Sequence, residues 1–285
     1  MYNVLGKEFP VSLGQVINRP SKSIKTPYVA DVCLSGFEGK EACLAHTPSL
    51  GCNGMVDSNA TVFMMSKAEE SKAKCRYTVI ASQISEKDHN YIVGVDPTFG
   101  EKLGRDILLG GTLQCFTAKT LDSQFSYEDC RFDFKGITTS NEPFICEVKN
   151  VSIAVYENIR PSQMKKRDYT TRAVDSKVAI FPSGFKPKGQ THSERAVKQT
   201  KRLTDIKRKH PEVRCLILYV IQREDISSFQ ISNGDEVYLE TVKEALAANV
   251  EIAAVSISWK ASENGTALVP TIHNNAVKVS MGDYI

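Results

Sequence analysis

The sequence predicts an α+β protein in two parts, an all-β N-terminal part followed by a larger mixed α/β part. Two observations predict this division. Short runs rich in β-branched and aromatic residues, separated by Gly, Asn, Ser and Pro, fill the first third of the chain. After residue 90, apolar runs alternate with segments of helical spacing. The 285 residues suffice for two modest domains, and we predict domains at 1–86 and 87–285.

The N-terminal part contains three clear strand candidates, at 28–34 (YVADVCL), 60–65 (ATVFMM) and 75–83 (CRYTVIASQ). With weaker runs between them, the pattern indicates roughly five short strands, which is typical of a small barrel or sandwich. The polar segment ISEKDHN (84–90) is predicted to be a linker between the two parts.

The C-terminal part alternates between helical and extended patterns. We predict helices at 101–111, 192–210 and 237–249, and strands at 178–184, 213–223 and 250–259, with a hairpin at 131–150 and a polar loop at 157–177. Strands that alternate with helices predict a mixed α/β sheet with both faces covered. The tail from residue 260 to 285 shows no strong period.

The composition of the chain indicates its cellular compartment but says little about its function. Hydrophobic content is 41% and the net charge is only +3. The N-terminus lacks a basic segment followed by an apolar one, so no signal peptide is expected, and the longest apolar run, CLILYVI, is too short to cross a membrane. Eight widely spread cysteines in a chain of this length favour reduced thiols, and hence a cytoplasmic or other reducing intracellular compartment.

The stretch RFDFKGITTSNEPFICEVKN (131–150) places charged residues where a buried strand is expected. Because side chains alternate along a strand, Glu147 and Lys149 point the same way, and Phe144, Cys146 and Val148 point into a core. If this strand pairs with the preceding one, Asp133 joins Glu147 and Lys149 on the face opposite the core.

These three side chains could perform metal-assisted phosphodiester hydrolysis. Two close carboxylates repel each other unless a cation lies between them, and Mg²⁺ takes one or two carboxylates together with water and substrate phosphate. A neighbouring lysine can act on the attacking water and on the phosphate charge. The alternative is that Asp133, Glu147 and Lys149 form a solvated ion-pair cluster on a polar strand face, which contributes little.

A second feature is the concentration of positive charge at residues 186–209, where nine Lys or Arg accompany two acidic residues. Arg160, Lys165, Lys166, Arg167 and Arg172 add to it from the preceding loop. Such clustering is typical of a surface that binds the phosphate backbone of DNA or RNA, although a solvated helix face has the same pattern. The residues expected to contact nucleic acid are Lys188, His192, Arg195, Lys198, Lys201 and Arg202.

The order of these motifs resembles the SfsA family, the sugar fermentation stimulation proteins. The resemblance rests on RFDF (131–134) and CEVKNV (146–151), and it extends to further blocks in the same order between roughly residues 19 and 259. These blocks are YVADVCL (28–34), HTPSLG (46–51), VGVDPT (93–98), FPSGFKPKGQTHSERAVKQ (181–199) and YVIQREDISSF (219–229).

The resemblance implies an OB-fold-like barrel followed by a restriction-endonuclease-like domain of the PD-(D/E)xK type. It implies that Asp133 and Glu147 bind Mg²⁺ or Mn²⁺ and that Lys149 is catalytic, with Asp106 assisting the metal. It places Gln222 at a polar position near the site and His192 in a Gly-x-x-His element. Thr191, Ser193 and Ser49 depart from the family pattern.

The leading hypothesis is therefore a DNA-binding protein with a metal-dependent nuclease site, and an oligomer is compatible with it. The first alternative is a non-catalytic nucleic-acid-binding or regulatory module of the same fold. The second is an interaction protein whose basic face meets acidic protein partners. Strand scission on adding metal separates the first two, and a failure to bind nucleic acid at low salt would favour the third.

Overall fold

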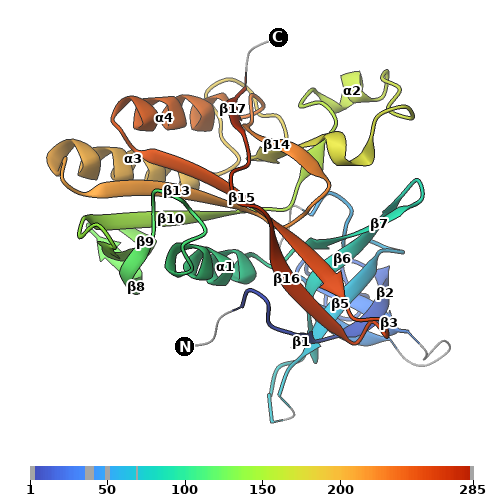
Figure 1. Cartoon of the computed structure of the whole chain (residues 1–285). Coiled ribbons are helices and arrows are strands. Elements are labelled where there is room, and N and C mark those ends of the chain that lie inside the picture. Colours follow the sequence, from blue (N-terminus) through green and yellow to red (C-terminus); the bar gives the residue numbers. More distant parts are fainter. Residues whose placement is uncertain (1–3, 36–41, 49–51, 69, 283–285) are drawn as a thin grey trace. The chain divides into compact units, whose positions relative to one another are not determined.

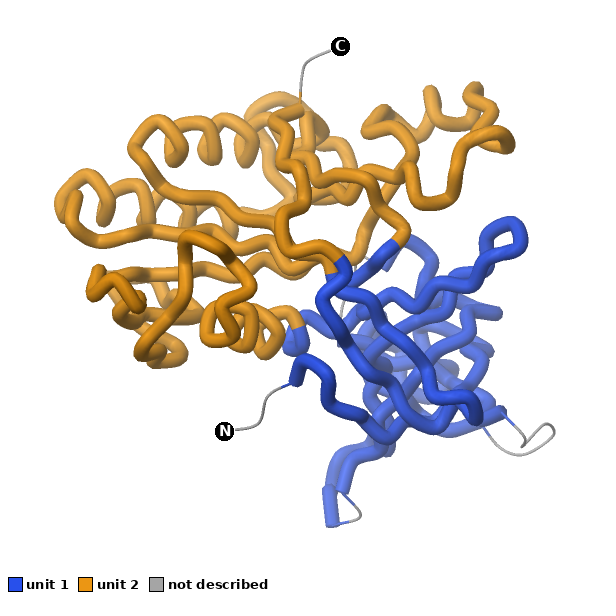
Figure 2. Tube along the Cα trace, viewed as in Figure 1, with its two compact units in different colours: residues 1–99, 222–224, 257–273 blue, residues 100–221, 225–256, 274–285 orange. Residues whose placement is uncertain are grey.

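The computed structural model describes residues 4–35, 42–48, 52–68 and 70–282, and the chain divides into two compact units (Figure 2). Unit 1 comprises residues 1–99, 222–224 and 257–273, and unit 2 comprises residues 100–221, 225–256 and 274–285. Ser49 lies outside the described residues. No described helix is long and apolar enough to cross a membrane.

Unit 1 is built around a closed five-stranded barrel, as predicted (Figure 1). Its strands follow the order β4-β3-β2-β5-β6, and a parallel pairing of β4 with β6, Ala45 opposite Tyr77, closes the ring. This strand order is that of an OB-fold. Their bounds are β2 (Ser12–Asn18), β3 (Val29–Leu34), β4 (Cys43–His46), β5 (Thr61–Ser66) and β6 (Tyr77–Glu86).

The barrel fills its interior with small and branched side chains. Val16, Val32, Ala45 and Val62 are at most 1% exposed. Gly14 is required by this packing, because a Cβ atom there would lie 2.7 Å from Val32 Cγ1. The alternation of buried and exposed residues along β2 is the period-two pattern expected of a strand with one face in a core.

The segment 84–90 is not a linker. It forms the turn and ends of a hairpin, in which β7 (His89–Gly94) pairs with β6 from Glu86 opposite His89 to Ala81 opposite Gly94. Its polar residues reflect a tight turn with Lys87 at positive φ. Unit 1 also includes β1 (Phe9–Pro10), which pairs antiparallel with β16 (Ala267–Asn274), so part of the chain after residue 260 is a strand.

Unit 2 contains a mixed sheet in the order β15-β13-β10-β9-β8. The three strands β10, β13 and β15 are parallel, and the β8–β9–β10 meander is antiparallel. Their bounds are β8 (Ala118–Tyr127), β9 (Cys130–Thr138), β10 (Pro143–Val151), β13 (Arg214–Ile221) and β15 (Glu251–Ala261). This is the mixed α/β sheet that the alternating pattern predicts.

Helices cover both faces of this sheet, as Figure 1 shows. On one face α3 (Glu194–Lys209) and α4 (Glu236–Ala247) bury apolar stripes against β10 and β13, with Leu203, Ile206, Leu239 and Val242 in the core. On the other face α1 (Pro97–Leu109) packs closely, because Gly104 has no side chain: a Cβ there would lie 2.8 Å from Val148 Cγ2.

The helix ends follow ordinary capping chemistry. In α3, Glu194 occupies the first turn and Lys207, Arg208 and Lys209 the last, which complements the helix dipole. In α4, the Asp235 carboxylate accepts a hydrogen bond from the Tyr238 amide at 3.0 Å.

A second, four-stranded sheet completes unit 2 in the order β11-β12-β14-β17. Its strands are β11 (Ala154–Val155), β12 (Lys177–Phe181), β14 (Ile226–Ile231) and β17 (Val279–Met281). The region predicted as a loop at 157–177 is mostly irregular and contains the short helix α2 (Pro161–Met164) and the single turn η1 (Val174–Ser176). The sequence signalled neither β14 nor β17.

Candidate active site

The hairpin at 131–150 forms as predicted. β9 and β10 are antiparallel neighbours, with Phe134 opposite Cys146 and Ile137 opposite Pro143. The turn between them is fastened by Thr138, whose amide donates to the carbonyl of Glu142 at 2.9 Å. The two strands that carry Asp133 and Glu147 are therefore adjacent, with β13 on the other side of β10.

The face of β10 that carries Glu147 and Lys149 is buried, and it is not the solvated face of the alternative interpretation. Glu147 is 3% exposed and Lys149 is 7% exposed. The physical reason is that β10 is an internal strand, parallel to β13, in a sheet with helices on both faces. Phe144 and Val148 face α1 and its following loop, and the opposite face of the strand is covered by α3.

Lys149 is held by two acceptors. Its Nζ donates to Glu147 Oε1 at 2.8 Å and to Gln199 Oε1 at 2.7 Å. Gln199 is buried in α3, and its Nε2 donates in turn to the main-chain carbonyl of Arg131 in β9 at 3.0 Å. A single amide side chain thus ties α3 to β9 and fixes the direction of the ammonium group. Sequence reasoning missed Gln199, whose only signal was its polar character on the apolar side of a predicted helix.

The side chain of Asp133 accepts a main-chain hydrogen bond from β10 at the point where the regular pairing of β9 and β10 stops. The pairing ends at Phe134 opposite Cys146, and the next outward-facing amide of β10, that of Val148, donates to Asp133 Oδ2 at 2.8 Å. The side chain of Asp133 therefore satisfies a main-chain donor that would otherwise be left in a largely buried position.

The two carboxylates are strained electrostatically. Burial, then the Glu147 carboxylate, raises the pKa of Asp133 to about 7, although the Val148 amide opposes the shift. Burial also raises the pKa of Glu147, against the lowering effects of Lys149 and of Arg195 in α3. Two partly buried carboxylates that disfavour joint ionisation are what a bound cation would relieve.

This arrangement predicts an unusual pH dependence of stability. The folded-state pKa of Asp133 is raised from 3.8 to about 7, so the native state binds more protons than the unfolded state between those values, and the free energy of unfolding falls as pH rises through this window. We expect the melting temperature in chelator to drop between about pH 4 and about pH 7, and Asp133→Asn to remove much of that drop. Equal slopes for both proteins in thermal unfolding would contradict this assignment.

The residues present fit a divalent cation. Glu147 Oε2 is buried and has no hydrogen-bond partner among the described residues. Asp133 and Glu147 are hard oxygen donors on adjacent strands, and Mg²⁺ needs no more than one or two carboxylates from the protein. Within the described parts of the chain, no group of three or more His, Cys, Asp or Glu forms a metal site, so main-chain oxygens and water would complete the coordination.

The contacts of Asp106 in α1 do not indicate that it assists metal binding. It is buried, and its Oδ1 lies 3.7 Å from Arg105 Nη1. The acidic side chain of α1 that acts on Asp133 is Glu101, whose charge contributes to the raised pKa of Asp133. Glu101 accepts a hydrogen bond from Gln124 Nε2 at 2.6 Å. The sequence contained Glu101 in the predicted helix, but nothing in its spacing marked it.

Gln222 is fully buried, and its Nε2 donates to the carbonyl of Asp96 at 3.1 Å. Both residues belong to unit 1, whereas Asp133, Glu147 and Lys149 belong to unit 2. The role of Gln222 at the site, like that of Asp106, stays a prediction.

The basic residues of α3 divide into two groups. The positive charge of Arg195 lowers the pKa of Glu147. Lys198 and Arg202 instead pair with the turn between β8 and β9, at 2.8 Å from Asp129 in both cases. Lys188 and Lys201 are exposed. His192 is held through its amide, which donates to Asp235 Oδ2 at 2.7 Å.

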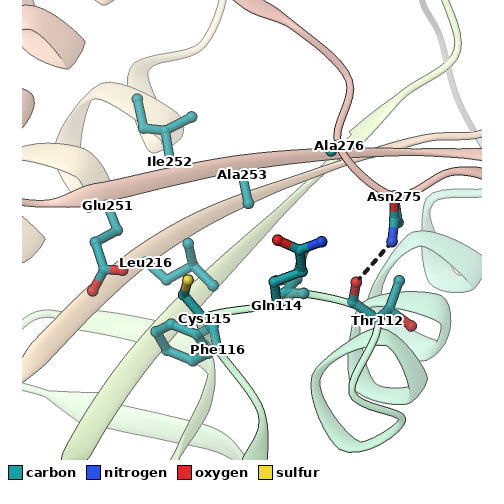
Figure 3. Close-up of a pocket in the computed structure, with 11 residues that line it drawn as sticks. Thr112, Gln114, Cys115, Phe116, Leu216, Glu251, Ile252, Ala253, Asn275 and Ala276 are labelled. Atoms are coloured by element: carbon teal, nitrogen blue, oxygen red, sulfur yellow. Dashed lines mark hydrogen bonds between the residues drawn. The ribbon is translucent and has the colours of Figure 1, made fainter.

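A pocket of about 280 Å³ lies elsewhere in unit 2 (Figure 3). It is lined largely by apolar groups, including Leu113, Phe116, Leu216 and Ile252, at the amino ends of β13 and β15. None of the predicted site residues lines it. In open α/β sheets ligands usually bind at the carboxyl ends of the strands, so this pocket is at the less favourable end.

Comparison with known proteins agrees with this architecture. Residues 170–263 match the sequence model of the SfsA family, described as the sugar fermentation stimulation protein RE domain. The structure of Pyrococcus furiosus SfsA in complex with Ca²⁺ superimposes with a TM-score of 0.69 at 17% identity, over 98% of this chain and 100% of that one. The resemblance to the SfsA family is confirmed. No curated protein sequence matched.

The SfsA likeness extends over both units in fold, but the matched family segment begins after β10. Asp133, Glu147 and Lys149 therefore lie outside residues 170–263, and their assignment rests on the geometry described above. A repair endonuclease from Pyrococcus abyssi was also found, with a TM-score of 0.26, 11% identity and coverage of 86% of this chain and 84% of that one, and a score this low supports no argument.

Proposed function

We propose that this SfsA-like protein binds DNA and hydrolyses phosphodiester bonds with a divalent cation. The observation that supports this most is the pair of carboxylates on adjacent strands, the half-buried Asp133 and the buried Glu147, with Lys149 donating a hydrogen bond to Glu147 at 2.8 Å. The raised pKa of each carboxyl group supports this proposal, because perturbed pKa values cluster at functional sites.

In this proposal Asp133 and Glu147 hold Mg²⁺ or Mn²⁺, which supplies a Lewis acid for the phosphate and lowers the pKa of a bound water. Lys149, oriented by Gln199, places a positive charge beside the attacking water and the phosphate. In the same proposal Arg195, whose charge lowers the pKa of Glu147, contacts the substrate phosphate. That Pyrococcus furiosus SfsA forms a Ca²⁺ complex supports divalent-cation binding in this fold.

A non-catalytic nucleic-acid-binding module is the second candidate, and one observation favours it. Lys149 and Glu147 are almost completely buried, and a buried ion pair can simply be structural. In that case the site residues would specify the packing of α3 on the sheet, and nucleic acid would bind without being cut.

Cleavage assays separate the two candidates. Purified protein is incubated with single- and double-stranded DNA and RNA in chelator, Mg²⁺, Mn²⁺ or Co²⁺, beside Asp133→Asn as the matched inactive control. We expect metal-dependent scission by the wild type alone. Binding without scission on every substrate would leave the binding module, and cleavage by Asp133→Asn at the wild-type rate would place the activity at another site or in a contaminant.

A further inference from the structure

The row of cations on α3 is largely engaged within the protein. Lys198 Nζ and Arg202 Nη2 each lie 2.8 Å from an oxygen of Asp129, and Arg202 also pairs with Glu128 at 2.5 Å. Lys209 lies 3.7 Å from Glu128. The acidic turn between β8 and β9 thus neutralises several of the positive charges of α3. This lowers the electrostatic attraction between this part of α3 and the phosphates of DNA.

A second positive segment, residues 156–172, which we call the basic loop, surrounds α2. It carries five basic side chains and two acidic ones, a net charge of +3, which equals the formal net charge of the whole chain. The remainder of the protein therefore has equal numbers of basic and acidic side chains. Figure 1 shows α2 well separated from α3, so the two positive segments form distinct surfaces of unit 2.

The basic loop is held in a defined conformation from inside. The Glu157 carboxylate lies 2.8 Å from Arg172 Nη2 and 3.4 Å from Arg167 Nε. The rings of Tyr156 and Tyr169 stack at 5.1 Å. Because these contacts order the loop before any ligand arrives, less conformational entropy is lost when it binds.

Two cations at the tip of the basic loop remain available. Lys165 and Lys166 directly follow α2 and are exposed. Among the described residues, neither has an ion-pair partner, in contrast to Lys198 and Arg202 of α3. Exposed lysines that keep their full charge gain most from neutralising phosphates and releasing counterions.

Chain connectivity links the basic loop to the candidate active site. β10 carries Glu147 and Lys149 in its second half and runs through β11 into the loop. Tyr156 is seven residues after Lys149, so their Cα atoms are at most about 25 Å apart. Along one DNA strand, with a spacing of about 3.4 Å, this corresponds to no more than about seven nucleotides. The loop also follows the carboxyl end of a parallel strand, where ligands of such sheets bind.

We propose that the basic loop, residues 156–172, is the principal phosphate-contacting surface of unit 2, and that it binds the same nucleic acid as the site formed by Asp133, Glu147 and Lys149. This inference rests on the proposed function and names the surface through which the substrate is held. The loop contacts the phosphate backbone of the nucleic acid. Binding at the loop is therefore independent of the nucleotide sequence and weakens as the salt concentration rises.

The test is a pair of matched charge reversals. The variant Lys165→Glu/Lys166→Glu is compared with Lys198→Glu/Arg202→Glu, which changes the net charge equally at the two cations of α3 that pair with Asp129. Binding of a fluorescent DNA duplex is measured by anisotropy in chelator over a series of salt concentrations. We expect the loop variant to bind at least about tenfold more weakly, with a log–log salt slope smaller by about 1.8, and the α3 variant to stay within about threefold of wild type.

Each outcome has one meaning. Loop-variant affinity equal to that of wild type, or a larger loss in the α3 variant, overturns the inference but leaves the proposed function standing. A wild type that binds no nucleic acid at low salt overturns the proposed function itself. Because Lys165 and Lys166 are exposed, the folding of the variant is checked by an unchanged melting temperature, and Lys165→Ala/Lys166→Ala should give a smaller loss in the same direction.

Discussion

Replacing Glu147 with glutamine should abolish cleavage and leave nucleic-acid binding intact. A neutral amide is a poorer ligand than a carboxylate for a hard cation, so metal affinity falls. The loss of several kcal/mol of transition-state stabilisation corresponds to a rate decrease of about 10³-fold or more. Removing a negative charge near the phosphate path should leave affinity for DNA in chelator equal or slightly higher.

The fold should tolerate this change. Glutamine keeps the size of the side chain, and its amide oxygen can still accept the hydrogen bond that Lys149 Nζ now donates to Glu147 Oε1. The measurements are cleavage rate, metal binding by calorimetry and DNA binding in chelator, all on the same preparation. Scission by Glu147→Gln at the wild-type rate would show that another group performs the chemistry.

Replacing Lys149 with methionine should remove activity by a different route and should destabilise the protein. Methionine is similar in length, but it leaves Glu147 3% exposed without its ion-pair partner and leaves Gln199 Oε1 without its donor. Removing one partner of a buried pair typically costs about 3–5 kcal/mol. A divalent cation at the two carboxylates should restore much of this loss, because it replaces the missing positive charge.

The decisive readout is the effect of metal on stability. We expect the melting temperature of Lys149→Met to lie well below that of wild type in chelator and to rise more than that of wild type when Mn²⁺ is added, while cleavage stays absent. Lys149→Arg is the control that keeps the charge and should retain most of the stability. If Mn²⁺ stabilises neither wild type nor Lys149→Met, the carboxylates do not hold a cation.

The prediction from sequence was most accurate where the signal is local. Helix α3 was expected at 192–210 and spans Glu194–Lys209, because an apolar stripe marks the helix and Pro211 follows its end. The hairpin of β9 and β10 was also expected, since turn residues separate two strands with matched alternation. The linker at 84–90 was wrong because a polar turn inside a hairpin and a linker have the same composition.

The pattern of residues along the chain determined that Glu147 and Lys149 share one face of a strand, because side-chain alternation depends only on neighbouring residues. It also indicated the two-part organisation and the alternation of strands and helices up to β15, although it signalled neither β14 nor the strands after residue 261. Only the tertiary structure decided that this face is buried beneath α3, that Gln199 orients Lys149, and that Glu101 acts on Asp133. It likewise decided that Asp129 engages Lys198 and Arg202 and leaves Lys165 and Lys166 exposed. These contacts join residues tens of positions apart, and no local period encodes which distant partner a charged side chain will meet.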